Sequence, residues 1–512
     1  MREEILGVFF KRNLIFILAL GTGLTAVTLA GWFLAIPWGE GRGDRPCPVP
    51  NGFREIAWLA PPSSSLGWQR LVAAAQFGFS KGTFPECSLE ISNAFPSDPA
   101  KTPEFLIRWK SKTLVWRWYR ADEELAITEK LLERNPPPIA MVGGTSTDNA
   151  KQLAERLAMA ACSHSMGKPV LMLTTATADD ISYTETPAPM RRKLLKIHEG
   201  LTFRAGFSNN YMAHILINFL KSQSVWTGSL PAPWIMKWED DPYATDLMEA
   251  FRNSWKNLPD HQGSSAELPN PISIKSSVGG LARPNVDESS AATLFTERAS
   301  KFTNLENNWL VLCGQILPSR RLLKVMSREN GSRMRGLTVV SGDTLGFNTI
   351  YRDWQELWPS IDLPYRLVFF CHQNPVDTAA GFEADPSAAM RHLATGTEDL
   401  LLDRDVIHSL IEGWKFIADT DGPVDLASCL KKLKYIPTGP TLASAIDNLP
   451  NFFDYEGNRM PATGEHLVTL SPPSINKQPN GPGQIEVWSV PGNSTSSRFT
   501  RIKQLSQPVY RQ

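Results

Sequence analysis

The sequence predicts an α/β protein with two parallel-sheet lobes behind an N-terminal transmembrane helix. Three observations lead to this prediction. The chain has 512 residues, which exceeds the usual size of a single compact core. Apolar strands alternate with helix-like segments in two successive series. A long apolar segment without charged residues lies near the N-terminus.

The apolar segment spans residues 13–38 and reads NLIFILALGTGLTAVTLAGWFLAIPW. About 20 apolar residues cross the bilayer core, so the segment is long enough for a membrane anchor. A cleavable signal peptide is the alternative, but its best cleavage site, Thr28–Ala30, falls inside the apolar run. Arg2, Lys11 and Arg12 precede the segment, and basic flanks favour the cytoplasmic side. We therefore predict a single-pass membrane protein with a cytoplasmic N-terminus and its main body on the periplasmic or extracellular face.

Three strand–turn–helix units follow the anchor. Their strands read REIAWLA (54–60), PPIAMV (137–142) and KPVLML (168–173), and each leads into a turn of small residues. Continuous apolar strands that alternate with helices are typical of a parallel sheet covered on both faces. Ligands of such sheets bind beyond the carboxyl ends of the strands, where these turns lie.

A second series of the same kind comes later in the chain. Its strands read APWIMKW (232–238), NNWLVLCG (307–314) and RGLTVVSG (335–342), and each precedes a predicted helix, the last over residues 343–354. The repetition predicts a second α/β lobe. The segment PYRLVFFC and a helix over 397–417 are predicted to return the chain to the first lobe.

Composition and motifs argue against several functions. The chain carries 52 basic and 52 acidic side chains, so it offers no basic field for nucleic acid. Its six cysteines form no CxxC pair, which disfavours a zinc ribbon or a thioredoxin-like site, whereas Cys47 and Cys87 could pair as a disulfide. HEGLT at His198 lacks the second histidine of HExxH, and GFSNN is not a GxSxG elbow. We predict no enzyme activity, no cofactor, no metal site and no nucleic-acid partner.

The segment IAMVGGTST (139–147) ends an apolar run with two glycines and three hydroxyl residues. It lacks the Lys of a Walker loop and the GxGxxG of a dinucleotide fingerprint. Hydroxyls at a helix start indicate either an anion cradle, for example for a carboxylate, or ordinary N-capping. The turns SSSLGW and TTAT occupy the same kind of junction, so we expect the hydroxyls of all three turns to converge on one crevice.

Five segments in order carry a resemblance to a known family. They read EIAWLAPPSSSLGW, PPIAMVGGTSTDNAKQLAERLA, GKPVLMLTTATADDIS, TFRAGFSNNYMAHILINFL and WIMKWEDDPYATDLMEAF. Together they resemble the type I periplasmic binding proteins, and most closely the branched-chain amino-acid receptors of ABC importers. The resemblance covers about residues 53–454, where FFDYEGNRM resembles the family's late hairpin. It implies two Rossmann-like lobes, three hinge crossovers and a cleft that closes on a small ligand.

The anchor and the resemblance together predict a domain layout. It comprises a cytoplasmic tail (1–12), a transmembrane anchor (13–38), a linker (39–52), lobe 1 (53–222), lobe 2 (223–355), a return to lobe 1 (356–450), and a return to lobe 2 with a C-terminal extension (451–512).

The resemblance also implies a ligand site between the lobes. The predicted ligand-binding residues are Trp68, Ser146, Thr147, Thr175, Ala176, Thr177, Tyr243, Gln315 and Asp343. By analogy with the family, the lobe-1 hydroxyl and backbone groups would hold the carboxylate of the ligand. Asp343 would pair with its ammonium group, and Tyr243 would line the cleft. Such a site suits a zwitterion.

Several features depart from the family pattern. Gln315 stands where the family often has an aromatic residue, and Ala244 stands in place of a glycine. Insertions are predicted at residues 97–120 and 181–192, beside the cleft. Each of three residues also has a structural interpretation: Asp343 as a cap of the helix that follows, Tyr243 as part of the core, and Trp68 as a surface aromatic residue against its lobe.

We therefore carry three hypotheses of function forward. The first is a binding protein that delivers an amino acid or related carboxylate to an ABC permease. The second is a ligand sensor or receptor that acts through a partner, because the 12-residue tail is too short for a signalling domain. The third is a binding-protein fold that has lost its pocket and serves as an interaction module.

Overall fold

The computed structural model describes residues 46–506 except for internal segments. These segments are 99–100, 121–123, 161–167, 184–189, 199, 224–229, 240, 262–267, 275–285, 301–304, 306–307, 331–333, 335, 346–364, 374, 376–397, 420–425, 434–452, 454–455, 457, 460–465, 472–483 and 491–498. Contacts divide the chain into one unit of residues 1–48 with 97–101 and a second unit of all other residues. The description below concerns the second unit.

The predicted cytoplasmic tail, the anchor at 13–38 and the linker up to residue 45 lie outside the described residues. The helix predicted over 343–354 also lies largely outside them. Among the helices that are described, none combines the length and the apolar character needed to cross a membrane.

Lobe 1 is built on a seven-stranded sheet with the order β2-β3-β4-β1-β5-β6-β9. The strands are β1 (Phe53–Ala60), β2 (Cys87–Glu90), β3 (Glu104–Trp109), β4 (Lys112–Arg120), β5 (Ala140–Gly143), β6 (Val170–Leu173) and β9 (Thr202–Arg204). Strands β4, β1, β5, β6 and β9 are parallel, and β3 and β2 continue the sheet in antiparallel fashion. The central strand β1 is buried over its last six residues, as a strand covered on both faces should be.

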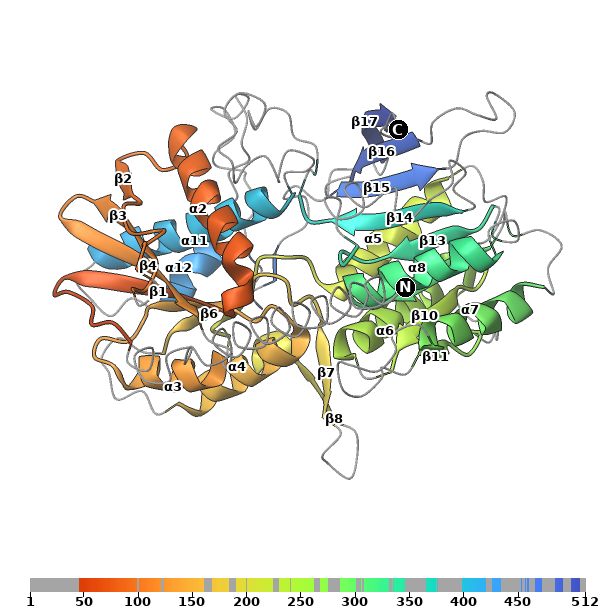
Figure 1. The fold of residues 1–512 in the computed structure, drawn as a ribbon, viewed down its shortest axis with the longest axis horizontal. Coiled ribbons are helices and arrows are strands. Elements are labelled where there is room, and N and C mark those ends of the chain that lie inside the picture. Colours follow the sequence, from red (N-terminus) through yellow and green to blue (C-terminus); the bar gives the residue numbers. More distant parts are fainter. Residues whose placement is uncertain are drawn as a thin grey trace, which may run out of the picture. The chain divides into compact units, whose positions relative to one another are not determined.

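Helices cover both faces of the lobe-1 sheet. One face packs against α2 (Ser65–Ser80), α11 (Glu398–Asp419) and α12 (Leu426–Lys432). The other face packs against α3 (Glu124–Glu133) and α4 (Thr147–Met159). Figure 1 shows α11 and α12, in blue, beside the red and orange elements of lobe 1, so chain segments that are far apart in sequence share one core.

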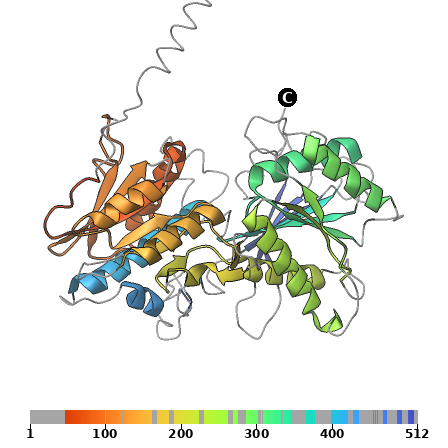
Figure 2. The same cartoon turned by 90° about the horizontal axis from the view of Figure 1, so that it is seen from below.

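Lobe 2 is built on an eight-stranded sheet with the order β11-β10-β12-β13-β14-β15-β16-β17. The strands are β10 (Trp234–Trp238), β11 (Ile272–Ile274), β12 (Trp309–Cys313), β13 (Thr338–Ser341), β14 (Arg366–Cys371), β15 (His466–Ser471), β16 (Gln484–Ser489) and β17 (Thr500–Ser506). Its helices are α5 (Asn209–Ser222), α6 (Pro242–Lys256), α7 (Val286–Ala299) and α8 (Ile316–Asn330). Figure 2 shows this sheet between two layers of helices, and the contacts pair α5 with α6 and α7 with α8.

The remaining elements are short. A hairpin is formed by β7 (Asp180–Tyr183) and β8 (Met190–Lys193), and it occupies the insertion predicted at residues 181–192. Single turns of 3₁₀ helix are η1 (Pro62–Ser64), η2 (Leu194–Lys196) and η3 (Pro259–His261).

The two parallel sheets share one strand order. Numbered along each lobe, the parallel strands of lobe 1 (β1, β4, β5, β6, β9) and of lobe 2 (β10, β11, β12, β13, β14) both run 2-1-3-4-5 across the sheet. Two doubly wound α/β lobes are therefore confirmed. The order reverses direction beside strand 1 in each lobe, and that reversal is where such sheets bind ligands.

The lobes exchange helices, which changes three boundaries of the predicted layout. Helix α5 (209–222), predicted in lobe 1, packs in the lobe-2 core. Strand β14, predicted to return the chain to lobe 1, pairs with β13 in the lobe-2 sheet. Phe453 still packs on Phe203 of lobe 1, so the second return comes after residue 459 rather than at 451. Sequence patterns identified these strands and helices but not their sheets, because an apolar stripe fits either lobe equally well.

Three further expectations change at the level of elements. The predicted insertion at 97–120 contains β4, which pairs with β1 along its whole length and is a full member of the sheet. The region predicted as a return to lobe 2 with a C-terminal extension holds three strands, β15, β16 and β17, which continue the lobe-2 sheet. Cys87, which was considered as one half of a disulfide, carries a free thiol.

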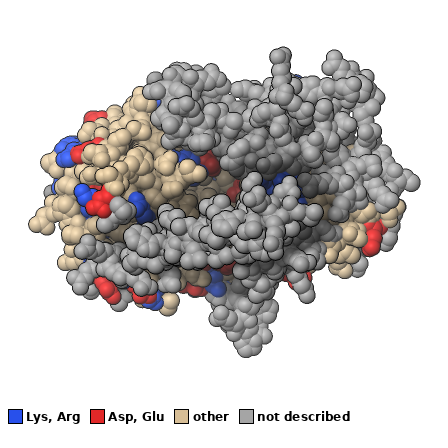
Figure 3. All heavy atoms as spheres, viewed as in Figure 1, with Lys and Arg blue, Asp and Glu red and all other residues tan. Residues whose placement is uncertain are grey.

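Charged side chains of both signs are mixed on the surface shown in Figure 3. The described Lys and Arg residues there alternate with Asp and Glu residues rather than gathering in one field. This agrees with the balance of 52 basic and 52 acidic side chains in the chain.

A buried carboxylate ties lobe 2 to lobe 1. Asp246 of α6 accepts hydrogen bonds from the backbone N–H groups of Asp179 (2.9 Å) and Asp180 (3.0 Å) and from Nδ2 of Asn209 (2.9 Å). Its side chain is buried, and burial, followed by the negative charge of Asp179, raises the pKa of Asp246 to about 6. The charge of the Asp246 carboxylate in this contact between the lobes therefore changes under mildly acidic conditions.

This contact gives stability a defined pH dependence. The pKa of Asp246 is about 6 in the folded chain and about 3.9 in an unfolded chain. The folded chain binds this proton more tightly, so the contribution is complete below about pH 4 and is lost as the pH rises through about 6. We expect the free energy of unfolding of the wild type, measured relative to Asp246→Asn in urea, to fall by up to about 3 kcal/mol across this interval. A difference between the two proteins that stays constant with pH would contradict this assignment.

Candidate functional site

The candidate site follows from the points at which the strand order reverses. In lobe 1 the reversal lies between β1 and β5, and the turn after β5 leads into α4. In lobe 2 it lies between β10 and β12, and the turn after β10 leads into α6. Helices α4 and α6 are in contact, so the two reversal points belong to one region.

The lobe-1 side is the glycine turn and the start of α4. Ser146 is the N-cap residue, and its Oγ accepts a hydrogen bond from the Asn149 N–H (3.2 Å). Thr147 is the first residue of the helix and is only 4 % exposed. The N–H groups of the first helical turn and the helix dipole favour an anion at this place. The structure therefore bears out ordinary capping by Ser146 and leaves the anion site as a prediction.

The second predicted turn is occupied by internal contacts. Thr175 Oγ1 donates to the backbone oxygen of Thr145 (3.0 Å), and Thr177 Oγ1 donates to Oδ1 of Asn209 on α5 (2.9 Å). Thr177 and Ala176 are buried, whereas Thr175 is exposed. This turn thus fastens the glycine turn and α5 in place, and the ligand contacts of Thr175, Ala176 and Thr177 stay a prediction.

Trp68 belongs to the core of lobe 1. Its Nε1 donates to the backbone oxygen of Ala94 (2.8 Å), and its rings pack on Trp58 and Trp118. The side chain is 1 % exposed. We therefore leave Trp68 out of the candidate site.

The lobe-2 side is centred on Asp343, which follows β13. Tyr243 lies in the first turn of α6, and its Oη donates to Asp343 Oδ1 (3.0 Å). Burial, followed by the charge of Asp343, raises the pKa of Tyr243 well above its usual value, so this hydroxyl keeps its proton and acts as a donor. Gly342 makes the contact possible, because a Cβ at this position would lie 2.7 Å from the Tyr243 Oη.

His372 holds the other oxygen of the same carboxylate. It follows β14 directly, and its Nε2 lies 3.0 Å from Asp343 Oδ2. Its Nδ1 accepts the backbone N–H of Phe207 (3.0 Å), which leaves Nε2 to carry the ring proton and donate it to Asp343. His372 is not among the site residues predicted from the sequence. The signal that could have found it is a polar residue immediately after a buried strand, as with Asp343.

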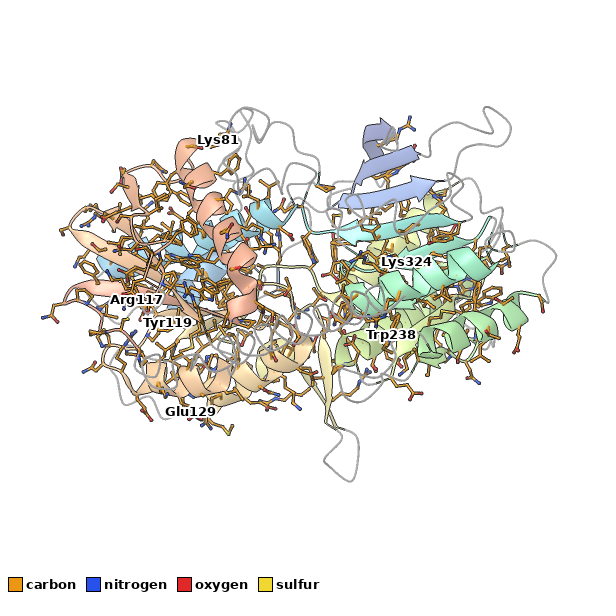
Figure 4. All side chains as sticks on the ribbon, viewed as in Figure 1. Lys81, Arg117, Tyr119, Glu129, Trp238 and Lys324 are labelled. Carbon is orange, nitrogen blue, oxygen red and sulfur yellow. The ribbon has the colours of Figure 1, made fainter. Side chains whose placement is uncertain are left out.

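A second carboxylate lies at the reversal point of lobe 2. Asp241 is the N-cap of α6, and its Oδ1 accepts the N–H of Tyr243 (3.0 Å). Burial raises the pKa of Asp241, and the negative charge of Asp148 in the first turn of α4 raises it further. Gln315, which is exposed, lies beside Asp241. Figure 4 labels Trp238, which ends β10 just before this turn.

The structure thus brings part of the predicted set together. Tyr243 and Asp343 are hydrogen-bonded to each other, and Gln315 borders Asp241 at the reversal point. Helix α4, which begins with Ser146 and Thr147, contacts α6, and its Asp148 interacts electrostatically with Asp241. Thr175, Ala176 and Thr177 support this region from the next turn, and Trp68 lies elsewhere. His372 and Asp241 are additions that the sequence did not identify.

Chemically, the arrangement offers two unlike poles. Lobe 2 presents the Asp343 carboxylate, fixed by two donors, with Asp241 nearby. Lobe 1 presents a helix N-terminus with a hydroxyl cap. Among the described residues, no group of three or more His, Cys, Asp or Glu side chains has the geometry of a metal site.

Comparison with known proteins gives matches by structure only. No protein-family model matches the chain, and no curated protein is similar to it in sequence. A leucine-binding protein from Thermotoga maritima is similar over 88 % of this chain and 99 % of its own, with 11 % identity and a TM-score of 0.49. A leucine-, isoleucine-, valine-, threonine- and alanine-binding protein from Brucella ovis is similar over 89 % and 95 %, with 10 % identity and a TM-score of 0.49.

A third similar structure is a solute-binding protein of an ABC transporter from R. palustris in complex with benzoate. It covers 90 % of this chain and 98 % of its own, with 12 % identity and a TM-score of 0.45. These neighbours are type I periplasmic binding proteins, the family that the sequence resembles. Because every TM-score is below 0.5, the ligands in these names belong to those proteins and carry no conclusion about this chain.

The glycine turn yields a test of the lobe-1 side. Gly144 has φ +70°, and a Cβ there would lie 2.7 Å from Leu173 Cδ2 and 3.0 Å from Ala150 Cα. Gly82 has nearly the same φ, +69°, with no atom within 4 Å of the added Cβ. We expect Gly82→Ala to lower the free energy of unfolding by about 1 kcal/mol and Gly144→Ala by about 3 kcal/mol, in urea titrations. Equal losses would show that the space around Gly144 is not needed.

Proposed function

We propose that this chain is a binding protein that holds a small polar ligand between its two lobes. The observation that carries the proposal is the Asp343 carboxylate, which two donors fix in lobe 2 in the region where α6 meets the N-terminus of α4. A carboxylate favours a cationic group of the ligand, and a helix N-terminus favours an anionic one. A ligand with both groups, such as an amino acid or a related zwitterion, fits this arrangement best.

The geometry supports binding rather than turnover. Tyr243 keeps its proton because burial raises its pKa, and the proton of His372 is directed at Asp343. Both side chains therefore orient the carboxylate, and neither is aimed at a reacting group from these positions. We accordingly propose no catalytic step.

We further propose that the body lies outside the cytoplasm and that residues 13–38 anchor it in the membrane. The support is the sequence itself, which has 26 residues without charge in that segment, after a basic flank. An anchored binding protein would keep its ligand close to an ABC permease, which is the partner that the family resemblance suggests. A sensor that passes its ligand-bound state to a membrane partner would use the same anchor.

One observation favours a second candidate, an interaction module without a ligand. The hydroxyl groups of Thr175 and Thr177 donate hydrogen bonds within the protein, and Trp68 lies in the lobe-1 core. These residues leave fewer groups for a ligand than the family resemblance implied. The two candidates differ in whether Asp343 meets a ligand at all.

The test is a thermal-shift screen of the full chain in mild detergent against amino acids, amines, carboxylates, amides and sugars. A bound ligand stabilises the folded state by about 2.7 kcal/mol at a hundredfold excess over its Kd. We expect at least one zwitterion to raise the melting temperature, and we expect Asp343→Asn to weaken its binding by about tenfold or more, because a charged hydrogen bond is lost.

The matched control is Asp260→Asn. Asp260 is an acidic residue on the surface of lobe 2 that pairs with Lys221 (2.8 Å) away from the site. We expect its substitution to leave ligand binding unchanged. A screen without a single stabilising compound would favour the interaction module. Equal binding by Asp343→Asn and the wild type would instead rule out Asp343 as a contact of the ligand.

A further inference from the structure

The chain passes between the lobes three times, after β9, after β14 and after Arg459, and we call these segments the first, second and last passages. One buried arginine, Arg459, links them. Arg459 precedes the last passage, and its Nη1 donates to the backbone oxygen of Ala205 (3.1 Å) in the first passage. Its guanidinium also lies over the ring of Phe207, 5.0 Å from the centroid. Nη2 donates to Oδ2 of Asp405 on α11 (3.1 Å). Arg459 therefore joins the first and last passages to a helix of lobe 1.

Asp405 brings in the remaining passage. Its Oδ2 also accepts Nε2 of Gln373 (2.5 Å), and its Oδ1 accepts Nε of Arg404 (3.0 Å). Gln373 follows β14 by two residues and starts the second passage. Asp405, Arg459 and Gln373 are all buried, so the network lies in a low-dielectric environment where each bond is strong and a lost partner is costly.

His372 connects this network with the candidate site. It is the neighbour of Gln373, its Nδ1 accepts the N–H of Phe207, and its Nε2 donates to Asp343. Gly206 allows the ring to lie this close to the backbone, because a Cβ at that position would be only 3.2 Å from its Cε1. One side chain thus bridges the Asp343 carboxylate and the first passage.

We propose that His372 couples ligand occupancy of Asp343 to the first passage between the lobes. A carboxylate at Nε2–H increases the electron density of the imidazole ring, which makes Nδ1 a stronger acceptor for the Phe207 N–H. A cationic ligand group bound to Asp343 lowers this electron density, which makes Nδ1 a weaker acceptor for the Phe207 N–H. The occupancy of Asp343 therefore changes the strength of a hydrogen bond in the first passage, which is a segment that must bend in a hinge motion. This inference rests on the proposed function, but the link between Asp343 and Phe207 can be tested without any ligand.

The test is a double-mutant cycle read by hydrogen–deuterium exchange resolved to the Phe207 amide. The variants are Asp343→Asn, His372→Asn and the double variant, each in the full chain. The amide oxygen of Asn at position 372 takes the place of Nδ1, so it keeps the acceptor for Phe207 but does not reach Asp343. We expect Asp343→Asn to speed Phe207 exchange about fivefold or more in the wild-type background and to have no further effect in His372→Asn.

Two results would overturn the proposal. One is an unchanged Phe207 exchange rate in Asp343→Asn. The other is an equal acceleration with and without His372, since the effect would then travel by another route. The control background is His261→Asn, a histidine stacked on Trp255 and bonded to the Leu230 carbonyl, in which Asp343→Asn should retain its full effect.

A second substitution keeps the test usable if His372→Asn does not fold. The amide nitrogen of Gln at position 372 reaches Asp343 as Nε2 does, but leaves no acceptor for the Phe207 N–H. We expect fast Phe207 exchange in His372→Gln and no added effect of Asp343→Asn. Added acceleration there would overturn the proposal as well.

The ligand arm uses L-leucine as the probe, with 4-methylpentanoate and 3-methylbutylammonium as analogues that lack one charge. We expect the probe that binds to change Phe207 exchange in the wild type by about twofold or more and to leave it unchanged in His372→Asn. If neither a probe nor any compound of the thermal-shift screen binds while the ligand-free cycle succeeds, the link between Asp343 and Phe207 stands and the proposed function is wrong. If a probe binds and the cycle fails, the proposed function stands and the coupling is wrong.

Discussion

Each lobe of this chain is completed by a helix that arrives from the other lobe. Helix α5 follows a strand of lobe 1 and packs in lobe 2, and α11 follows a strand of lobe 2 and packs in lobe 1. Neither core is complete until the chain has passed between the lobes. This exchange is the constraint on which the rest depends, because it brings the passages together and makes them carry any movement of one lobe against the other.

The site is a consequence of the same topology. Parallel strands end at one edge of each sheet, and the shared order 2-1-3-4-5 places the reversal points beside β1 and β10. The polar residues that follow the lobe-2 strands lie at this edge of the sheet: Asp241 after β10 at the reversal point, Asp343 after β13 and His372 after β14. Glycines at positions 342 and 206 keep the space that Tyr243 and His372 need to approach this carboxylate and the first passage.

Much of the fold could be predicted from the sequence. Runs such as WLVLC and REIAWLA are continuous and apolar because their strands are covered on both faces. The helices α4 and α6 begin at the polar N-caps Ser146 and Asp241. Sheet membership could not be predicted for α5 and β14, because an apolar stripe does not specify its partner. The strand β4 was read as an insertion, since it follows an antiparallel hairpin rather than a helix.

The site could be predicted only in part. Tyr243 and Asp343 were identified through the family resemblance, and the structure brings them within hydrogen-bonding distance of each other at 3.0 Å. Trp68, Thr175 and Thr177 match the same pattern, but their contacts are internal. A motif specifies residue types, whereas the direction of a hydroxyl depends on neighbours such as Asn209, which is distant in sequence. His372 was missed because its role comes from two contacts, with Phe207 and Asp343, that no local pattern reveals.

Whether the chain binds a zwitterion is tested most directly by native mass spectrometry. The full chain is measured after incubation with a mixed pool of amino acids, amines, carboxylates and sugars. We expect one molecule per chain to be retained, and we expect this molecule to carry both an ammonium and a carboxylate group. A retained compound that lacks the ammonium group, or a chain that retains no compound from the pool, would contradict this expectation.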